Sequence, residues 1–163
     1  DDDPVIFFEH KTLYGLQGEV PEGDYLVPFG KARIVSEGTD CTLVATGRMV
    51  SFCEDAAKAL AADGISCDII DPRTTSPLDE DAILDSVEKT GRLIVVDETP
   101  PRCSFAADVA ALAASEVFSS LKAPIKTVTG PHSPVPFAKE LENAFLPSPL
   151  KIKAVIEKTV KYS

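Results

Sequence analysis

The stretch CDIIDPRTTSPLDEDAILDSV, residues 67–87, joins an apolar strand-like run to the start of a helix. The run ends at Pro72, which has no amide hydrogen for a strand ladder. Ser76, Pro77 and Asp79 follow in the order typical of a helix start: a capping hydroxyl, a proline in the first turn and an acidic residue three positions after the cap. The stretch therefore predicts a strand–loop–helix joint with Ser76 as the N-cap, the repeating unit of an α/β sheet.

The remaining sequence repeats this alternation of strands and helices. Apolar runs predict strands near residues 32–36, 42–46, 66–71, 93–96 and 125–129, and apolar stripes at helical period predict helices after Arg48, Ser76 and Ser104, over 138–145 and around 152–160. Gly64 is expected in a left-handed conformation just past the first helix. The run at 93–96 is the most apolar and is expected at the centre of the sheet. Because crossovers between parallel strands are right-handed, the pattern predicts a three-layer α/β/α sandwich with a five-stranded, mostly parallel, doubly wound sheet.

The first 30 residues have a different character. Residues 5–8 (VIFF) are an apolar run typical of a buried strand, and residues 15–28 are rich in glycine, proline and acidic side chains. We therefore expect residues 1–30 to be the last strand and linker of a preceding domain, and residues 31–163 to form the compact domain.

Composition excludes several kinds of partner. The 163 residues carry a formal charge of −10, which repels nucleic acid and anionic membranes. The sequence contains no apolar run long enough to span a bilayer. Its four cysteines, which do not form a C-x-x-C pair, are expected to be reduced core residues: Cys41, Cys53, Cys67 and Cys103. These features predict a cytoplasmic protein with no nucleic-acid or membrane partner.

Catalytic motifs are absent from the sequence. The turn at Gly47 has one glycine, so it indicates a tight strand-to-helix turn rather than a phosphate loop. His10 lies in the linker region, where no pocket is expected, and His132 has no partner at a metal-ligand spacing. Asp97 and Glu98 are adjacent on a strand and should point to opposite faces. We therefore predict no catalytic, cofactor-binding or metal-binding residue in this chain.

Three arginines follow strand ends and leave an alternative open. Arg48, Arg73 and Arg102 are expected either to pair with the acidic residues Asp71, Asp97 and Glu98 or to serve an interface. Alternatively, the chain is an independent α/β domain that binds a small molecule or phosphate at the carboxyl edge of its strands, through residues 46–48. A receiver-like regulatory module is a further alternative, but it needs a lysine at a strand end and Lys126 begins its strand.

Residues 71–79, DPRTTSPLD, resemble the D-x-R-T-x-x-P-x-D segment of the transketolase C-terminal domain. Within that family, the segment resembles the version found in the β subunits of thiamine-diphosphate-dependent 2-oxo acid dehydrogenases, in the first component of these complexes. Residues 3–11 are similar to the last strand of the preceding pyrimidine-binding domain in these subunits, and residues 18–32 to their linker. Residues 47–50 and 97–104 are most similar to acetoin dehydrogenase β subunits.

This resemblance implies a function without catalysis by the chain itself. In the family, the catalytic glutamate lies in the pyrimidine-binding domain, and the α subunit holds thiamine diphosphate and magnesium. The chain is thus expected to be the C-terminal assembly domain of the β subunit of an acetoin or 2-oxo acid (pyruvate-type) dehydrogenase complex. It would bind no cofactor and be inactive alone, although the whole enzyme uses thiamine diphosphate and Mg. The implied partners are the α subunit, a second β subunit and a lipoyl acyltransferase.

The candidate interface has two parts. One is the apolar pair Phe7 and Phe8, and the other is the loop that carries His132, Pro134 and Phe137. An unpaired apolar strand tends to pair with another chain, and in the resembling family the loop lies towards partner subunits. We therefore expect the isolated chain to form a twofold homodimer.

Overall fold

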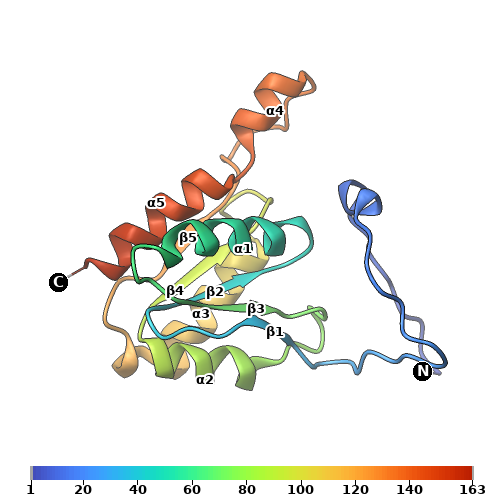
Figure 1. Ribbon diagram of the computed structural model, residues 1–163, viewed down its shortest axis with the longest axis horizontal. Coiled ribbons are helices and arrows are strands. Elements are labelled where there is room, and N and C mark those ends of the chain that lie inside the picture. Colours follow the sequence, from blue (N-terminus) through green and yellow to red (C-terminus); the bar gives the residue numbers. More distant parts are fainter. Residues whose placement is uncertain (1, 163) are drawn as a thin grey trace.

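The computed structural model describes residues 2–162 and contains one sheet in the order β1-β3-β2-β4-β5 (Figure 1). The strands β2 to β5 run parallel to one another, whereas the edge strand β1 is antiparallel to β3. The five-stranded, mostly parallel sheet predicted from the sequence is confirmed. The strands are β1 (Arg33–Ser36), β2 (Cys41–Ala45), β3 (Cys67–Asp71), β4 (Leu93–Val96) and β5 (Lys126–Val128).

Helices cover both faces of this sheet. One layer holds α1 (Arg48–Ala61) and α5 (Pro149–Val160), and the other holds α2 (Glu80–Thr90) and α3 (Phe105–Glu116) (Figure 1). Each layer encloses its own cluster of buried apolar side chains against the sheet. A short helix, α4 (Lys139–Phe145), projects beyond the sandwich, and two 3-10 turns complete the elements: η1 (Lys11–Gly15) and η2 (Phe118–Ser120).

The centre of the sheet is β2, not β4 as the sequence predicted. All residues of both strands are buried, because helices cover both faces of each strand. The apolar composition of β4 thus reflects its burial between two helical layers. It does not predict which strand lies at the centre of the sheet.

The helix α2 begins at Glu80, so the prediction that Ser76 caps it is wrong. Asp79 is at the N-cap position, but its side chain caps nothing. Its Oδ2 instead accepts a hydrogen bond from the Ala32 amide at 2.8 Å, and its Oδ1 lies 3.9 Å from Lys31 Nζ. The carboxylate is therefore used to fix the chain where it enters the sheet.

Two other end signals are confirmed. Ser104 caps α3, since its Oγ accepts a hydrogen bond from the Ala107 amide at 3.2 Å. Gly64 has a φ of +75°, as predicted for the residue that ends the first helix, and Gly91 at the C-cap of α2 has a φ of +73°. These glycines adopt a conformation that costs other residues steric energy.

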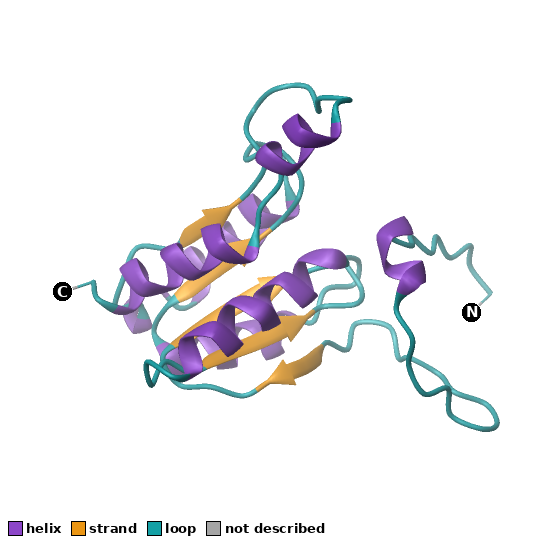
Figure 2. Cartoon of the chain, turned by 45° about the horizontal axis from the view of Figure 1, so that its top comes forward, coloured by secondary structure: helices purple, strands orange, loops and turns teal. Residues whose placement is uncertain are grey.

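The segment before β1 is an extended arm, defined here as residues 2–29, and it lies outside the sandwich (Figure 2). Residues 5–8 are exposed and form no strand in this chain, so their expected place as the last strand of a preceding domain stays a prediction. Such a run needs a neighbouring strand to satisfy its backbone groups. Within residues 2–162, no helix is long and apolar enough to cross a bilayer.

Candidate functional site

The arm meets the sandwich at the carboxyl edge of the parallel strands, in the loop after β4. His10 Nε2 and Glu98 Oε2 are 2.9 Å apart, and both side chains are about three-quarters buried. The Thr12 amide donates a hydrogen bond to His10 Nδ1 at 3.3 Å, so the neutral ring carries its hydrogen on Nε2 and donates it to Glu98. The ring also lies over Gly47, where an added Cβ would be 3.8 Å from the His10 side chain. The arm thus contacts the turn at Gly47, which itself remains exposed.

Asp97 and Glu98 lie just past the end of β4, not on a strand as expected, and they bind different partners. The Asp97 carboxylate is buried and accepts hydrogen bonds from the Ala106 amide at 3.2 Å and from the Thr99 hydroxyl at 2.7 Å. It therefore fixes the start of α3 and the loop before it. Glu98 holds the arm instead, and the two carboxylates do not form an acid/base pair.

The three arginines at this edge do not pair with the acidic residues there. Among residues 2–162, no ion pair involves Arg48, Arg73 or Arg102. The Arg48 guanidinium lies 4.6 Å from the centre of the Phe52 ring, and Arg73 has a left-handed φ of 59°.

The physical reason is that each expected acidic partner is already engaged. Asp71 Oδ1 accepts a hydrogen bond from the backbone amide of Arg73 at 3.1 Å. The carboxylates of Asp97 and Glu98 bind Thr99 with α3 and His10 respectively. The predicted ion pairs are therefore wrong, whereas the expected interface role stays a prediction: Arg73 and Arg102 are exposed, and Arg48 lies over Phe52.

The candidate interface residues are all exposed but do not form one surface. Phe7 and Phe8 are 83% and 90% exposed on the arm. His132, Pro134 and Phe137 are exposed in the loop before α4, which projects from another part of the sandwich (Figures 1 and 2). The structure thus gives two separate apolar projections.

The arm exposes more apolar surface than its first strand-like run suggested. Eleven of the eighteen exposed large apolar side chains lie in it, seven of them beyond residue 8: Tyr14, Leu16, Val20, Tyr25, Leu26, Val27 and Phe29. These residues are interspersed with glycine and proline and have no helix or strand period, so patterning alone does not single them out. The arm thus carries most of the exposed large apolar side chains of the described residues.

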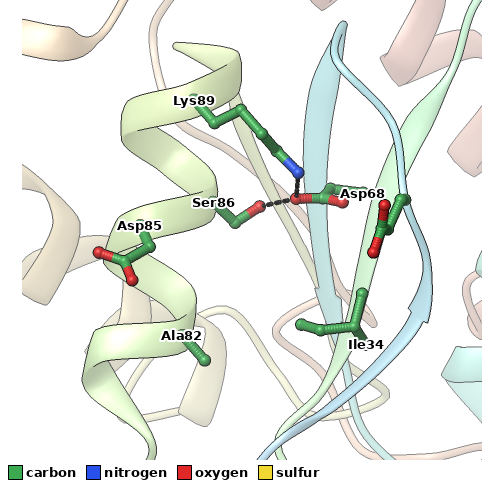
Figure 3. Close-up of a pocket in the computed structure, with 7 residues that line it drawn as sticks. Ile34, Asp68, Ala82, Asp85, Ser86 and Lys89 are labelled. Atoms are coloured by element: carbon green, nitrogen blue, oxygen red, sulfur yellow. Dashed lines mark hydrogen bonds and ion pairs between the residues drawn. The ribbon is translucent and has the colours of Figure 1, made fainter.

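A shallow depression of about 330 Å³ lies between β1 and α2 (Figure 3). Asp68 is 2% exposed at its inner end, and its Oδ2 accepts hydrogen bonds from Ser86 Oγ and Lys89 Nζ, both at 2.5 Å. Asp68 Oδ1 accepts another from the Gly38 amide at 3.1 Å. The carboxylate is therefore saturated by protein donors, and the depression is not a catalytic site.

The hydrogen bonds of Asp68 continue into the core. Thr42 Oγ1 lies 2.8 Å from both Ser86 Oγ and Thr90 Oγ1, and the Arg92 amide donates to Thr90 Oγ1 at 3.3 Å. Each hydroxyl has one hydrogen, so Ser86, which donates to Asp68, accepts from Thr42. The Thr90 hydroxyl accepts from the Arg92 amide and has two acceptors within reach for its own hydrogen, Thr42 Oγ1 at 2.8 Å and the Arg92 carbonyl at 3.2 Å. Sequence reasoning missed this network, although an aspartate within an apolar strand was a visible signal for it.

The described side chains do not fit a thiamine diphosphate–magnesium site. Within residues 2–162, no three His, Cys, Asp or Glu side chains lie close enough to hold a metal ion. The acidic groups at the carboxyl edge are engaged as described above. We therefore derive no chemical step through such a cofactor in this chain.

The chain is similar to one family model and to two kinds of curated protein. A family model described as "Transketolase, C-terminal domain" matches residues 30–152. The chain is 54% identical to the acetoin:2,6-dichlorophenolindophenol oxidoreductase subunit beta of Cupriavidus necator, over 99% of the chain and 48% of that protein. It is 55% identical to the Bacillus subtilis protein of the same name, over 95% of the chain and 45% of the relative. The identity to the pyruvate dehydrogenase E1 component subunit beta of Rickettsia felis is 42%, over 100% of the chain and 50% of that protein.

A solved structure confirms the architecture. The protein described as "Split gene transketolase, inactive beta4 tetramer" superposes with a TM-score of 0.74 at 24% identity, over 89% of this chain and 46% of that chain. The chain spans about half the length of the curated relatives that it matches.

Proposed function

Because the chain belongs to the family of transketolase C-terminal domains, we propose that it is the C-terminal assembly domain of the β subunit of a thiamine-diphosphate-dependent acetoin dehydrogenase. The observation that carries the proposal is the identity of 54–55% to two acetoin:2,6-dichlorophenolindophenol oxidoreductase β subunits. The identity to β subunits of pyruvate and 2-oxoisovalerate dehydrogenases is 41–42%. This difference favours acetoin over a 2-oxo acid as the substrate of the whole enzyme.

The arm supports the division of the chain into two parts. Residues 1–30 are, in this proposal, the last strand and linker of a pyrimidine-binding domain, and residues 31–163 are the C-terminal domain. The exposed apolar residues of the arm then lie against that preceding domain or a partner subunit. The contact of His10 with Glu98 holds the arm on the sandwich, and the contact of Asp79 with Ala32 fixes the chain just after the arm.

The proposed role of this chain is assembly. Thiamine diphosphate in the whole enzyme supplies the chemistry of acetoin cleavage, and this chain alone is inactive. The candidate partners are the α subunit, a second β subunit and a lipoyl acyltransferase. The arm and the loop of residues 131–137 are the surfaces offered to the subunits, because both carry exposed apolar side chains.

A chimeric β subunit tests the proposal. This chain replaces the C-terminal half of the Cupriavidus necator β subunit, which is then produced with its own α subunit; the unaltered β subunit is the control. We expect the chimera to copurify with the α subunit and to reduce 2,6-dichlorophenolindophenol with acetoin, as the unaltered β subunit does. A folded chimera that fails to copurify would overturn the assembly role. Exchange into the Rickettsia felis pyruvate dehydrogenase β subunit is the comparison, and equal or better assembly there would remove the preference for acetoin dehydrogenase subunits.

A further inference from the structure

Two cysteines face each other across the pairing of β2 with β3. Cys41 and Cys67 are register partners on these parallel strands, and Cys41 Sγ lies 3.5 Å from Cys67 Sγ. Both are free thiols, with exposed fractions of 0% and 4%. They form a dithiol inside the core cluster under α1 and α5.

The strand pairing brings the two cysteines within the range of a disulfide. Neighbouring strands are about 4.8 Å apart, and disulfide-linked residues have Cα atoms about 4.4–6.8 Å apart, so direct register partners meet the Cα criterion. The two sulfurs, 3.5 Å apart, then have to approach to about 2.05 Å.

The two thiols have different roles in their contact. Cys41 donates its hydrogen to Cys67, which raises the pKa of Cys41 and lowers the pKa of Cys67. Cys67 also lines an open depression of about 400 Å³, together with Lys58 and Ser66. Of the two cysteines, the one with the lowered pKa is thus also the one whose residue borders a depression, and thiolates are the reactive form of cysteine.

A third thiol lies in the same core cluster but does not share these features. Cys53 is buried on α1, and burial raises its pKa. It belongs to neither surface depression near these residues. The nearby Cys67 also raises the pKa of Cys53, but Cys53 forms no hydrogen bond with another thiol in the described structure. It thus provides an internal control with similar burial and without a hydrogen-bonded thiol.

We propose that Cys41 and Cys67 are an oxidative modification site, which a small hydroperoxide converts into an intrachain disulfide. The Cys67 thiolate attacks the peroxide oxygen, and the O–O bond breaks to give a sulfenic acid and a hydroxide or alkoxide ion. Cys41 then attacks the sulfenic sulfur, and water leaves as the S–S bond forms. For hydrogen peroxide, the two thiols lose two hydrogens and one peroxide is reduced to two waters, including the proton released by Cys67. The inference is independent of the proposed assembly role.

Peptide mapping distinguishes the three buried cysteines. Trypsin cleaves after Arg33, Arg48, Lys58 and Arg73, so Cys41, Cys53 and Cys67 fall in the separate peptides 34–48, 49–58 and 59–73. The starting protein is the whole chain with Cys103→Ser, which removes the exposed thiol. After treatment with hydrogen peroxide, we expect loss of two thiols per chain and a disulfide between peptides 34–48 and 59–73. Cys53→Ala in this background should retain the cross-link, and Cys41→Ser should abolish it.

The dependence on denaturant separates reaction of the folded protein from reaction after unfolding. In the folded state, the rate of disulfide formation should stay constant at low urea concentrations. A rate that rises in parallel with the population of the globally unfolded chain would overturn the proposal. It would also be overturned if the pair kept both thiols, or if Cys53 formed the cross-link instead.

Discussion

His10 donates a hydrogen bond from Nε2 to Glu98 Oε2 at 2.9 Å, across 88 positions of the sequence. This contact holds the arm against the loop after β4 and brings the His10 ring against the turn at Gly47. It also engages one oxygen of the Glu98 carboxylate at the carboxyl edge.

Glu98→Ala should release the arm without unfolding the sandwich. The partly exposed pair contributes about 0.5–1 kcal/mol, so trypsin should cleave after Lys11 roughly two to five times faster. Glu9→Ala is the matched control, because Glu9 bonds Tyr14 within the arm. Limited proteolysis measures both rates, and equal rates in the two variants would show that the His10 contact does not hold the arm.

Ser76→Ala should leave stability unchanged to within about 0.5 kcal/mol, because Ser76 caps no helix. Ser104→Ala should lower the free energy of unfolding by about 1 kcal/mol, because Ser104 Oγ accepts the Ala107 amide hydrogen at the start of α3. Urea unfolding of the two variants measures the difference. If Ser76→Ala were the more costly change, α2 would begin earlier in solution.

Ser86→Ala should cost about 1–3 kcal/mol of stability, because it removes a donor to buried Asp68 and an acceptor for Thr42. Ser115→Ala is the control, since Ser115 is an exposed helical serine that bonds only the Ala111 carbonyl. Its change should stay within about 0.5 kcal/mol. Equal losses by urea unfolding would mean that the network to Asp68 adds no net stability.

The order of elements followed from the sequence because apolar strands, helical stripes and end glycines such as Gly64 are local signals. The start of α2 could not be predicted at Ser76, because the conformation of that turn depends on the hydrogen bond from Ala32 to Asp79, which is 47 positions away. Residues 5–8 form no strand in this chain for a related reason, because a strand needs a neighbouring strand to pair with. The exposure of Phe7, Phe8 and Phe137 could be inferred only from a resemblance, as apolar composition by itself predicts burial.

The arm should make the isolated chain self-associate. Burying one phenylalanine is worth on the order of 2 kcal/mol, so two symmetric copies of Phe7 and Phe8 can exceed the lower estimate of the association cost, about 4 kcal/mol. The net charge of −10 on each chain opposes association. Salt screens this repulsion, and we therefore expect a weak twofold dimer that tightens as ionic strength rises.

Sedimentation at low and high salt tests which surface is responsible. The double change Phe7→Ser and Phe8→Ser should weaken the dimer by at least about tenfold, or 1.4 kcal/mol. Phe118→Ser, on an exposed phenylalanine of the sandwich, is the matched control and should leave the dimer unchanged. A dimer that survives the double change but is lost with Phe137→Ser would assign self-association to the loop before α4. A monomer at about 100 μM in both salts would contradict self-association by either surface, because that concentration corresponds to only about −5.5 kcal/mol of binding free energy.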